Sequence, residues 1–538
     1  MAEHLEHRAW SFRSYPGAFA VPCEPWHKVP VGSEEEDPFN AIISIQEQLN
    51  SDFQQTALYF KDTPALPPRW EEDGWEALGW SSEQFQLDRH GNFPVEGEPQ
   101  TGHTMFNVPY GTRGLRKLQV SGYLHIILSK TRQRPIFDVE TRQVVHVDLH
   151  VSQSEICQQL SWVDRTTCPR SRMHVYVDTE YMENRMEHPH RKDVLNHRLA
   201  GFIAGLAQFE GWPSRIRFLP RLVTLLAHED ESIKGVVDQT VQRLELQGLL
   251  RKEESEMDPV ISLHDSIPNT FFALLPLVGY DTRLAYLLFQ PSDPMTTWLK
   301  IQVAAMLTSG QDKLVSFQRG LYNPEDRLYV EIAMKTGYGA NLAHIGTLCM
   351  ILGLLKKGKF EVVYKDDSRP FVDDKVSLDH GACQEWEKRC IAIHNILSPG
   401  KPRVDILDEI GTLTDDQVEV LHWDCLRAFT FQIGVVNHPG DGRFPTVHDF
   451  ISGVELGFKS AAIMTDFDTI KENDPECMVG FFTTLFRTKD QPQTMINDWN
   501  WIPFSVWRRW REHLGSDRWA SLANKYDLGR NSDEFKYE

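Results

Sequence analysis

The sequence lacks the cysteine spacing of a zinc site or of a disulfide framework. Its eight cysteines are scattered, and no two of them form a C-x-x-C pair. That distribution is typical of free thiols in a reducing compartment. A signal peptide is also missing, because the first 20 residues show no basic start followed by an apolar run. We therefore expect a cytoplasmic protein without disulfides and without a metal centre of the zinc type.

Long apolar runs and an excess of positive charge are missing as well. The longest apolar stretch, residues 342–355, is interrupted by His344 and is too short to span a bilayer, so we expect no membrane partner. The 56 basic and 76 acidic residues give a formal net charge of −20. This charge argues against a protein coated in nucleic acid, and we expect no DNA partner. Local basic clusters, such as the one at residues 508–511, still allow a basic groove.

The chain is long enough for a large buried core and for several domains. It has 538 residues, of which 41% are hydrophobic and 25% charged, the usual mixture of a globular protein. Residues 1–115 are rich in proline, glycine, tryptophan and acids, and they predict an irregular N-terminal extension with one helix at 39–52. Residues 526–538 are polar and predict a frayed tail.

A strand and helix alternation follows the extension. Dense apolar segments predict buried strands at 118–128, 173–177 and 215–219, with a helix after Ser152 and another over 193–209. A hairpin is predicted from the segments around 135–151. Strand, helix, strand, helix, strand is typical of a doubly wound parallel sheet, so residues 116–220 predict the first part of an α/β core.

Polar residues stand at the ends of two of these strands. Ser129 follows the strand at 118–128, and Asp178 follows the strand at 173–177. Ligands of open parallel sheets bind beyond the carboxyl ends of the strands. The two residues are therefore candidates for a catalytic or binding site.

The middle of the chain predicts a large, mostly helical insertion at residues 221–383. A helix at 232–250 followed by a strand at 259–263 resembles a winged-helix element, although a plain helical insertion is favoured. A further strand is predicted at 356–364. Two nearby glycines, Gly337 and Gly339, support neither a phosphate loop nor a dinucleotide fingerprint.

Residues 384–525 predict the second part of the α/β core. Helices are expected at 384–397, 415–429 and 447–464, and strands at 432–436 and 478–486. An aromatic helix broken near Pro503 is expected at 500–510.

Three carboxylates open the predicted helix at 415–429. Asp415, Asp416 and Glu419 follow Thr414, a residue type that caps helices, and Asp415 and Glu419 share one helical face. Like charges at this spacing repel, and the helix N-terminus offsets part of that repulsion. The run is compatible with a solvated helix start, with a metal site, or with the recognition of an ammonium or guanidinium group.

An acidic Asp-Asp-x-x-Glu run resembles the first metal motif of class I terpenoid synthases. That resemblance would imply magnesium and a diphosphate substrate. The second metal motif of those enzymes has no full match, because the segment Asn497–Trp501 lacks the required serine. The strands predicted at 118–219 also differ from the all-helical terpenoid fold, so this reading is kept as an alternative.

Residues 119–219 resemble the Rossmann-like core of cyclodipeptide synthases. The matching segments are Ile126-Ile127-Leu128-Ser129, Val151-Ser152-Gln153 opening a helix, Val175-Tyr176-Val177-Asp178-Thr179, and a following helix with Arg191, Lys192 and Arg198. The chain departs from the family in the Lys-Thr-Arg after Ser129, in the hairpin near 131–150, and in the insertion 221–383. The later Tyr and Glu of those enzymes have no clear match, and Glu455 is the nearest candidate.

The acidic run and the α/β core together resemble the fungal arginine-containing cyclodipeptide synthases, which carry an Asp-Asp-x-x-Glu motif. This resemblance implies an α/β fold with a Rossmann-like parallel sheet core, a large, mostly helical insertion and an irregular N-terminal extension. It also implies an aminoacyltransferase of secondary metabolism that joins two amino acids into a diketopiperazine. The expected partners are arginyl-tRNA and a second aminoacyl-tRNA, with no cofactor and no metal.

The implied chemistry assigns a role to each candidate residue. Ser129 would accept the first aminoacyl group, and a nearby acid would take its proton. Asp415, Asp416 and Glu419, with Glu455, would be catalytic or hold the substrate's cation. Asp178, Arg191, Lys192 and Arg198 would bind the substrate. A third possibility is a non-enzymatic RNA- or protein-binding scaffold in which Ser129 is inert.

Overall fold

A computed structural model of the chain describes about half of its residues. These are 27–31, 55–60, 75–79, 103–108, 123–127, 131–138, 141, 143–150, 173–178, 198–208, 231–253, 260–264, 267, 269–317, 346–364, 372–373, 376–378, 380–400, 413–438, 445–458, 465, 467–475, 477–487 and 493–514. None of the helices within these ranges is both long and apolar enough to cross a membrane.

The chain divides into two compact units. The first comprises Met1–Arg134 and Asp148–His190, and the second comprises Pro135–Val147 and Arg191–Glu538. This division differs from the predicted domains. Residues 384–525, expected to complete the α/β core begun at 116–220, belong to the same unit as the expected insertion 221–383.

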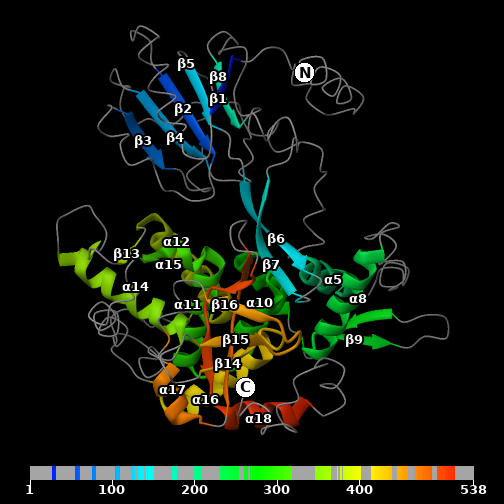
Figure 1. Ribbon diagram of the computed structural model, residues 1–538. Coiled ribbons are helices and arrows are strands. Elements are labelled where there is room, and N and C mark those ends of the chain that lie inside the picture. The colour runs from blue at the N-terminus through cyan, green and yellow to red at the C-terminus, as the bar shows by residue number, and fades with distance from the viewer. Residues whose placement is uncertain are drawn as a thin grey trace. The chain divides into compact units, whose positions relative to one another are not determined.

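Six parallel strands form a sheet in the first unit (Figure 1). Their order across the sheet is β1 (His27–Val31), β8 (Met173–Asp178), β5 (Tyr123–Ile127), β2 (Gln55–Phe60), β4 (His103–Val108) and β3 (Trp75–Gly79). Every neighbouring pair is parallel. Parallel strands need crossover connections, and all-parallel sheets occur in α/β proteins. The predicted fold class is confirmed at this level, as are the strands expected within 118–128 and at 173–177.

The prediction of an irregular N-terminal extension is wrong. Residues 1–115 contain four strands, β1 to β4, and these strands form two thirds of the described sheet. Each of them is only five or six residues long. Prolines, glycines and acids fill the chain between the strands, so the average composition of the segment concealed them. The predicted helix at 39–52 lies outside the described residues.

Helices dominate the described part of the second unit as far as residue 428 (Figure 1). They are α5 (Leu199–Ala207), α8 (Glu231–Leu246), α9 (Asn269–Leu274), η4 (Leu275–Val278), α10 (Thr282–Phe289), α11 (Pro294–Ser309), α12 (Gln311–Leu314), α14 (Thr347–Tyr364), α15 (His380–Leu397) and α16 (Asp415–Ala428). Local signals fix several starts. The Asp281 carboxylate accepts the backbone N–H of Arg283 at the start of α10. Asp293 accepts two N–H groups at the start of α11, which has Pro294 in its first turn.

Short antiparallel pairs accompany these helices. The hairpin of β9 (Leu250–Glu253) and β10 (Val260–Leu263) follows α8, and β10 confirms the strand predicted at 259–263. A second small sheet has the order β11 (Val315–Phe317), β13 (Val376–Leu378), β12 (Val372–Asp373). The strand predicted at 356–364 is wrong, because this segment is the second half of α14. The helix continues through Lys356-Lys357-Gly358, although a glycine inside a helix is unfavourable relative to alanine.

After α16 the second unit builds a mainly antiparallel sheet. Its strands are β14 (Ile433–Asn437), β15 (Thr446–Asp449), β16 (Glu455–Phe458), β17 (Met478–Phe481), β18 (Leu485–Arg487), β19 (Met495–Ile496) and β20 (Asn500–Ile502), with α17 (Phe467–Asn473) between β16 and β17. β14 pairs with β15 and β17, and β15 pairs with β16, in each case antiparallel. β17 pairs antiparallel with β20. β16 pairs parallel with β19.

These pairings close a barrel. The strand order across the sheet is β20, β17, β14, β15, β16 and β19. Only residues 497–499 separate β19 from β20 along the chain. β19 and β20 therefore act as one interrupted strand that joins both ends of the row. On the outside, β18 pairs with β19 and with β7 (Gln143–His150), and β7 neighbours β6 (Thr131–Asp138). The predicted hairpin near 135–151 is thus present, and its end belongs to this sheet.

The helix predicted at 447–464 is wrong. The segment instead forms β15, a turn and β16. Gly453 in the turn has φ 71°, a left-handed conformation that ends regular structure and that glycine adopts without steric cost. Burial alternates in β15, where Val447 and Asp449 are buried and Thr446 and His448 are half-buried. β15 and β16 have only four residues each, too few for a period of two to be distinguished from a helical period in the sequence.

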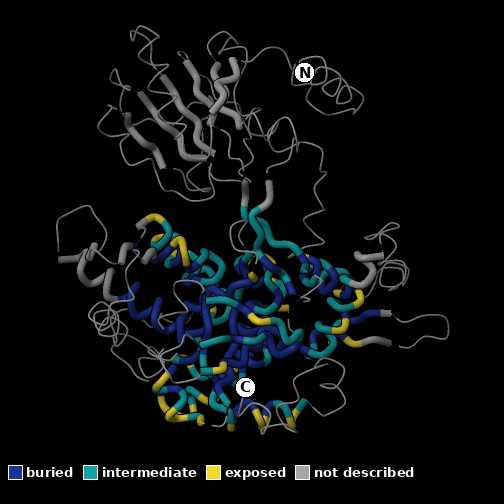
Figure 2. The backbone as a smooth tube through the Cα atoms, viewed as in Figure 1, coloured by how far each residue is buried: buried dark blue, intermediate teal, exposed yellow. Residues whose placement is uncertain are grey.

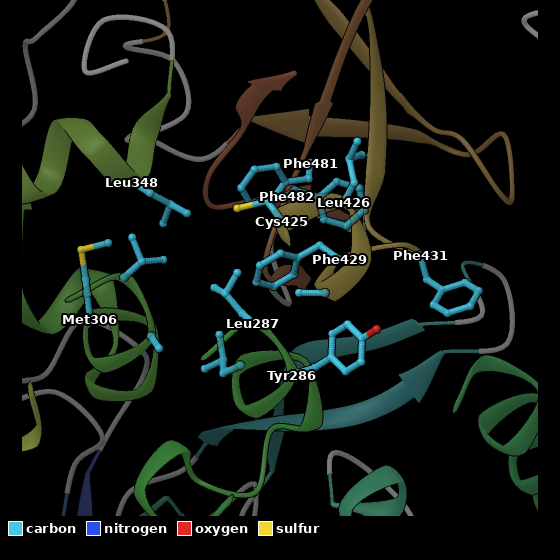
Figure 3. Packing of buried hydrophobic residues seen from close by; sticks show 14 of the residues in the cluster. Tyr286, Leu287, Met306, Leu348, Cys425, Leu426, Phe429, Phe431, Phe481 and Phe482 are labelled. Carbon is cyan, nitrogen blue, oxygen red and sulfur yellow. The ribbon is translucent and has the colours of Figure 1, made fainter. Parts of the chain in front are cut away.

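A continuous hydrophobic core joins the helices to the barrel. Dark blue, buried segments run through the second unit in Figure 2. In Figure 3, Leu287 of α10, Leu426 of α16 and Phe481 of β17 belong to one cluster. Phe429 stacks on Phe481 with ring centroids 5.1 Å apart. The last helix, α18 (Phe504–Leu514), buries Trp507 and Trp510 in the same core.

Candidate functional site

The structure describes only part of the site predicted around the parallel sheet. Ser129, Arg191 and Lys192 lie outside the described residues. Asp178 is the last residue of β8, as expected. Its strand neighbours β5, with Tyr176 opposite Ile127 at the end of β5. The two strand ends that carry the predicted polar residues therefore lie side by side at one edge of the sheet.

Arg198, one of the predicted substrate-binding residues, contacts an aromatic ring of the chain itself. It is the N-terminal flanking residue of α5 and is exposed. Its guanidinium carbon lies 5.9 Å from the centre of the Tyr280 ring. An arginine over an aromatic face gains a cation–π attraction. Arg198 thus connects α5 to the turn after η4.

The acidic helix begins as predicted. The Thr414 hydroxyl accepts the backbone N–H of Gln417, and the Gln417 side chain accepts the backbone N–H of Thr414. This reciprocal pair is a capping box. The Gln417 amide also donates to Asp293 at 2.9 Å, which joins the start of α16 to the start of α11. Asp415 and Asp416 are exposed in the first turn of α16.

Glu419 differs from the two aspartates because it has a cationic partner. Its carboxylate lies 2.9 Å from the guanidinium of Arg509 on α18, and both side chains are about half exposed. The cation that balances the acidic run is therefore, at this position, an arginine of the chain itself. Glu455 lies apart from the run, exposed on β16 of the barrel and opposite His448 of β15. Within the described residues, no three His, Cys, Asp or Glu side chains are grouped so as to hold a metal ion.

The buried face of α16 contains titratable groups that the sequence did not single out. Lys300 of α11 is fully buried and donates to Asp424 of α16 and to the carbonyl of Gln290, both at 2.8 Å. Burial raises the pKa of Asp424, and the Lys300 ammonium opposes that rise. Burial lowers the pKa of Lys300, and Asp424 opposes that fall. The pair thus ties two helices together in an apolar setting.

A small cavity lies beside this ion pair. It has a volume of about 40 Å³, room for about one to three water molecules. Lys300, His422, Cys425 and Trp501 are among the residues that line it. Burial raises the pKa of the Cys425 thiol and raises that of the neighbouring Cys349 to about 12, so neither thiol is prepared to act as a nucleophile.

His422 predicts a dependence of stability on pH. Burial lowers its pKa to about 4, against an ordinary value of 6.5. The folded state therefore holds the neutral imidazole, and its stabilising contribution is complete above pH 6.5 and is lost as the pH falls toward 4. Between pH 7 and pH 5 this loss is about 2 kcal/mol. Chemical denaturation should show that His422→Gln loses correspondingly less stability over this range, and parallel pH profiles for both proteins would contradict the assignment.

The barrel is the clearest candidate site, and the sequence prediction missed it. Along the chain, its first four strands are β14, β15, β16 and β17, and the helix α17 lies between β16 and β17. In the sheet, β14 lies between β15 and β17. The interrupted fifth strand pairs with the third and the fourth. This is the connectivity of an OB-fold, whose second and third strands and neighbouring loops bind oligonucleotides or oligosaccharides. In this chain those two strands are β15 and β16.

The described edges of that face are held in place by side chains. The His438 imidazole, at the end of β14, lies 2.7 Å from Asp468 of α17, and Lys471 donates to the His438 carbonyl at 2.8 Å. On the other side, Arg487 of β18 donates to the Thr494 hydroxyl at 2.8 Å. The connections from β14 to β15 and from β17 to β19 are the loops that contact ligands in OB-folds. The first of these loops therefore begins at His438, which is fixed by Asp468 and Lys471. In the second connection, Arg487 and Thr494 are joined by a hydrogen bond.

No protein-family model matches this chain, and no curated protein matches its sequence. Among solved structures it is similar to the E. coli DExH-box NTPase HrpB and to the Escherichia coli DEAH/RHA helicase HrpB, with 12% identity and a TM-score of 0.46 in both cases. The matches cover 90% and 88% of this chain and 47% of the other chains. The chain thus spans about half the length of these structures, and a similarity of this level carries no argument about function.

Proposed function

We propose that this chain binds single-stranded RNA through the outer face of β15 and β16. The observation that supports the proposal is the OB-type connectivity of the barrel. OB-folds bind single strands by stacking bases on side chains and by tracking the backbone along a groove. The OB-type connectivity therefore supports the alternative of a non-enzymatic RNA-binding protein.

The charge of the barrel sets the expected mode of binding. The exposed charged residues on β16 and α17 include the acids Glu455, Asp468 and Glu472. An acidic surface gains little from phosphate contacts, so base contacts have to supply most of the affinity. We expect the β15 and β16 face to contribute a shallow salt dependence, with only about one or two phosphates neutralised there and a slope of about −0.7 for each of them.

A charge reversal on the proposed face tests the function. Glu455→Lys should tighten binding of a fluorescein-labelled single-stranded RNA and steepen the salt slope by about 0.7, because the new lysine can neutralise one phosphate. Asp238→Lys makes the same charge change at an exposed position of α8, a helix outside the barrel, and is the matched control. Fluorescence anisotropy with the full chain measures both. Absence of saturable binding by the wild type up to about 100 µM, the weak end of non-specific affinity, would contradict the function.

Aminoacyl-tRNA-dependent synthesis of an arginine-containing cyclodipeptide is the second candidate. The observation that favours it is the adjacency of β5 and β8, which brings the strand ends before Ser129 and at Asp178 to one edge of a parallel sheet. Activated aminoacyl esters require only a nucleophile and a proton acceptor at such an edge. Mass spectrometry after incubation with charged tRNAs should then detect an arginine-containing diketopiperazine that Ser129→Ala does not make. Absence of this product with every charged tRNA would remove the candidate.

The terpenoid alternative gains no support from the described geometry. Its acidic motif would have to direct its carboxylates together at one magnesium site. Glu419 is instead paired with Arg509 on a different helix.

A further inference from the structure

We infer that α16 and α18 present a second RNA contact, in which a base stacks on Trp423. This inference rests on the proposed RNA binding and extends it to a surface outside the barrel strands. We call the surface the Trp423 platform, and we define it by Trp423 and Arg427 of α16 and Arg509 and His513 of α18.

The two helices lie side by side and run in the same direction. Glu419 is joined to Arg509 at 2.9 Å, and one turn later the Trp423 ring lies 5.7 Å from the His513 ring. Each helix advances by four residues between these two contacts. The platform is therefore built from consecutive turns of two helices, which are more rigid supports for a binding site than loops.

Trp423 belongs to the outward face of α16. The inward face carries Leu421, His422 and Cys425, which are buried. The outward face carries Asp416, Val420, Trp423 and Arg427, at the spacing of neighbours along one side of a helix. Trp423 is only half-buried, and Val420, one of two large apolar residues exposed in the described part of the chain, is 40% exposed. The indole packs against the core and keeps part of its surface accessible.

An arginine and a histidine lie beside the indole. The guanidinium carbon of Arg427 lies 6.0 Å from the Trp423 ring centre, and the same guanidinium donates to the Gln290 side chain at 3.1 Å. His513 approaches from the neighbouring helix. α18 adds Arg508, whose guanidinium lies 4.9 Å from the Phe504 ring, and Arg511. Arginines interleaved with aromatic rings suit a single strand, because the rings accept bases and the guanidinium groups attract phosphates.

The acidic start of α16 limits where a strand can lie. Asp416 and Arg427 are eleven residues apart, which corresponds to about 16 Å along a helix. Phosphates are therefore expected at the Trp423 and Arg427 end of α16 and not beside Asp415 and Asp416. A protein partner is the weaker alternative, because protein interfaces have an apolar centre and only Val420 is a well-exposed apolar residue on these two helices.

The test compares three variants in the RNA anisotropy experiment with the full chain. Trp423→Ala should weaken binding of the single-stranded RNA about 5- to 100-fold, the range expected for the loss of one stacked base. Trp423→Phe should retain most of the affinity, because a phenyl ring still stacks. Val420→Ala, one turn away on the same face, should leave the affinity unchanged. Thermal unfolding of each variant shows whether it remains folded.

The failures of this inference and of the proposed function can be told apart. Equal RNA affinity of the wild type and Trp423→Ala, together with tighter binding by Glu455→Lys, would overturn the platform and leave RNA binding at the barrel intact. Absence of RNA binding by the wild type would overturn both. If Trp423→Ala binds RNA normally but abolishes self-association seen by sedimentation, the surface is a protein interface and the inference is wrong.

Discussion

Asp424→Ala is expected to lower the free energy of unfolding by about 3–5 kcal/mol. Asp424 is the anionic partner of Lys300, whose side chain is fully buried, at a distance of 2.8 Å. Without the carboxylate, the ammonium keeps only the carbonyl of Gln290 as an acceptor. A buried charge without its counter-charge is costly, and the lysine has to lose its proton or draw water into the core.

Chemical denaturation followed by far-UV circular dichroism measures this effect. Lys300→Met together with Asp424→Leu should restore most of the stability, because well-packed apolar residues often replace a buried ion pair without loss. Asp416→Ala changes an exposed acid of the same helix and should cost less than about 1 kcal/mol. A loss at Asp424 no larger than the loss at Asp416 would show that the pair does not hold α11 and α16 together.

The helix α16 shows what the sequence can predict. Its start was predicted at Asp415 because Thr414 is a capping residue type, and the capping box confirms the reason as well as the position. Local signals of this kind act within four residues. The partners of α16 could not be predicted in the same way. Glu419 meets Arg509, and Asp424 meets Lys300, across separations of 90 and 124 residues.

The barrel shows why the rest could not be predicted. Its strands contain between two and five residues, too few for a period of two to stand out from a period of 3.6. Its closure depends on β19 and β20 sharing one interrupted strand, a property of pairing and not of composition. The turn at Ser452 and Gly453 was a usable signal, because a serine–glycine pair between apolar segments marks a turn. Given that turn, β15 and β16 could have been predicted as a hairpin.

The acidic run was given more functional weight from the sequence than its position supports. Three carboxylates in five residues suggested a binding site for the ammonium or guanidinium group of a substrate. In the structure the third of them already has a cation in Arg509. The positions that gain functional interest are the half-buried Trp423 and Arg427 on the outward face, because accessible aromatic and arginine side chains are common recognition groups.

Trp499→Ala is expected to destabilise the barrel by about 3–5 kcal/mol, the usual range for truncating a buried tryptophan. Trp499 lies in the interruption between β19 and β20 and is fully buried. Its indole N–H donates to the carbonyl of Gly434 on β14 at 3.2 Å. The ring also packs 5.4 Å from the Phe467 ring of α17. Removing it would leave a cavity where the fifth strand crosses the barrel. Trp423→Ala, a change at a half-buried helix surface, should cost much less and is the matched control.

Gly434 and Gly480 make room for the Trp499 ring, and a double-mutant cycle at Gly480 tests that relation. A Cβ atom at Gly480 of β17 would lie 2.6 Å from Cζ2 of Trp499 and 2.5 Å from the carbonyl oxygen of Asn500. Gly480→Ala should therefore cost about 1–3 kcal/mol by overpacking. In the Trp499→Ala background the contact with the ring is gone and only the carbonyl contact remains. The second substitution should then cost less, with a coupling of about 0.5–3 kcal/mol, as expected for residues in contact. Strictly additive losses would show that Trp499 does not occupy the space above Gly480.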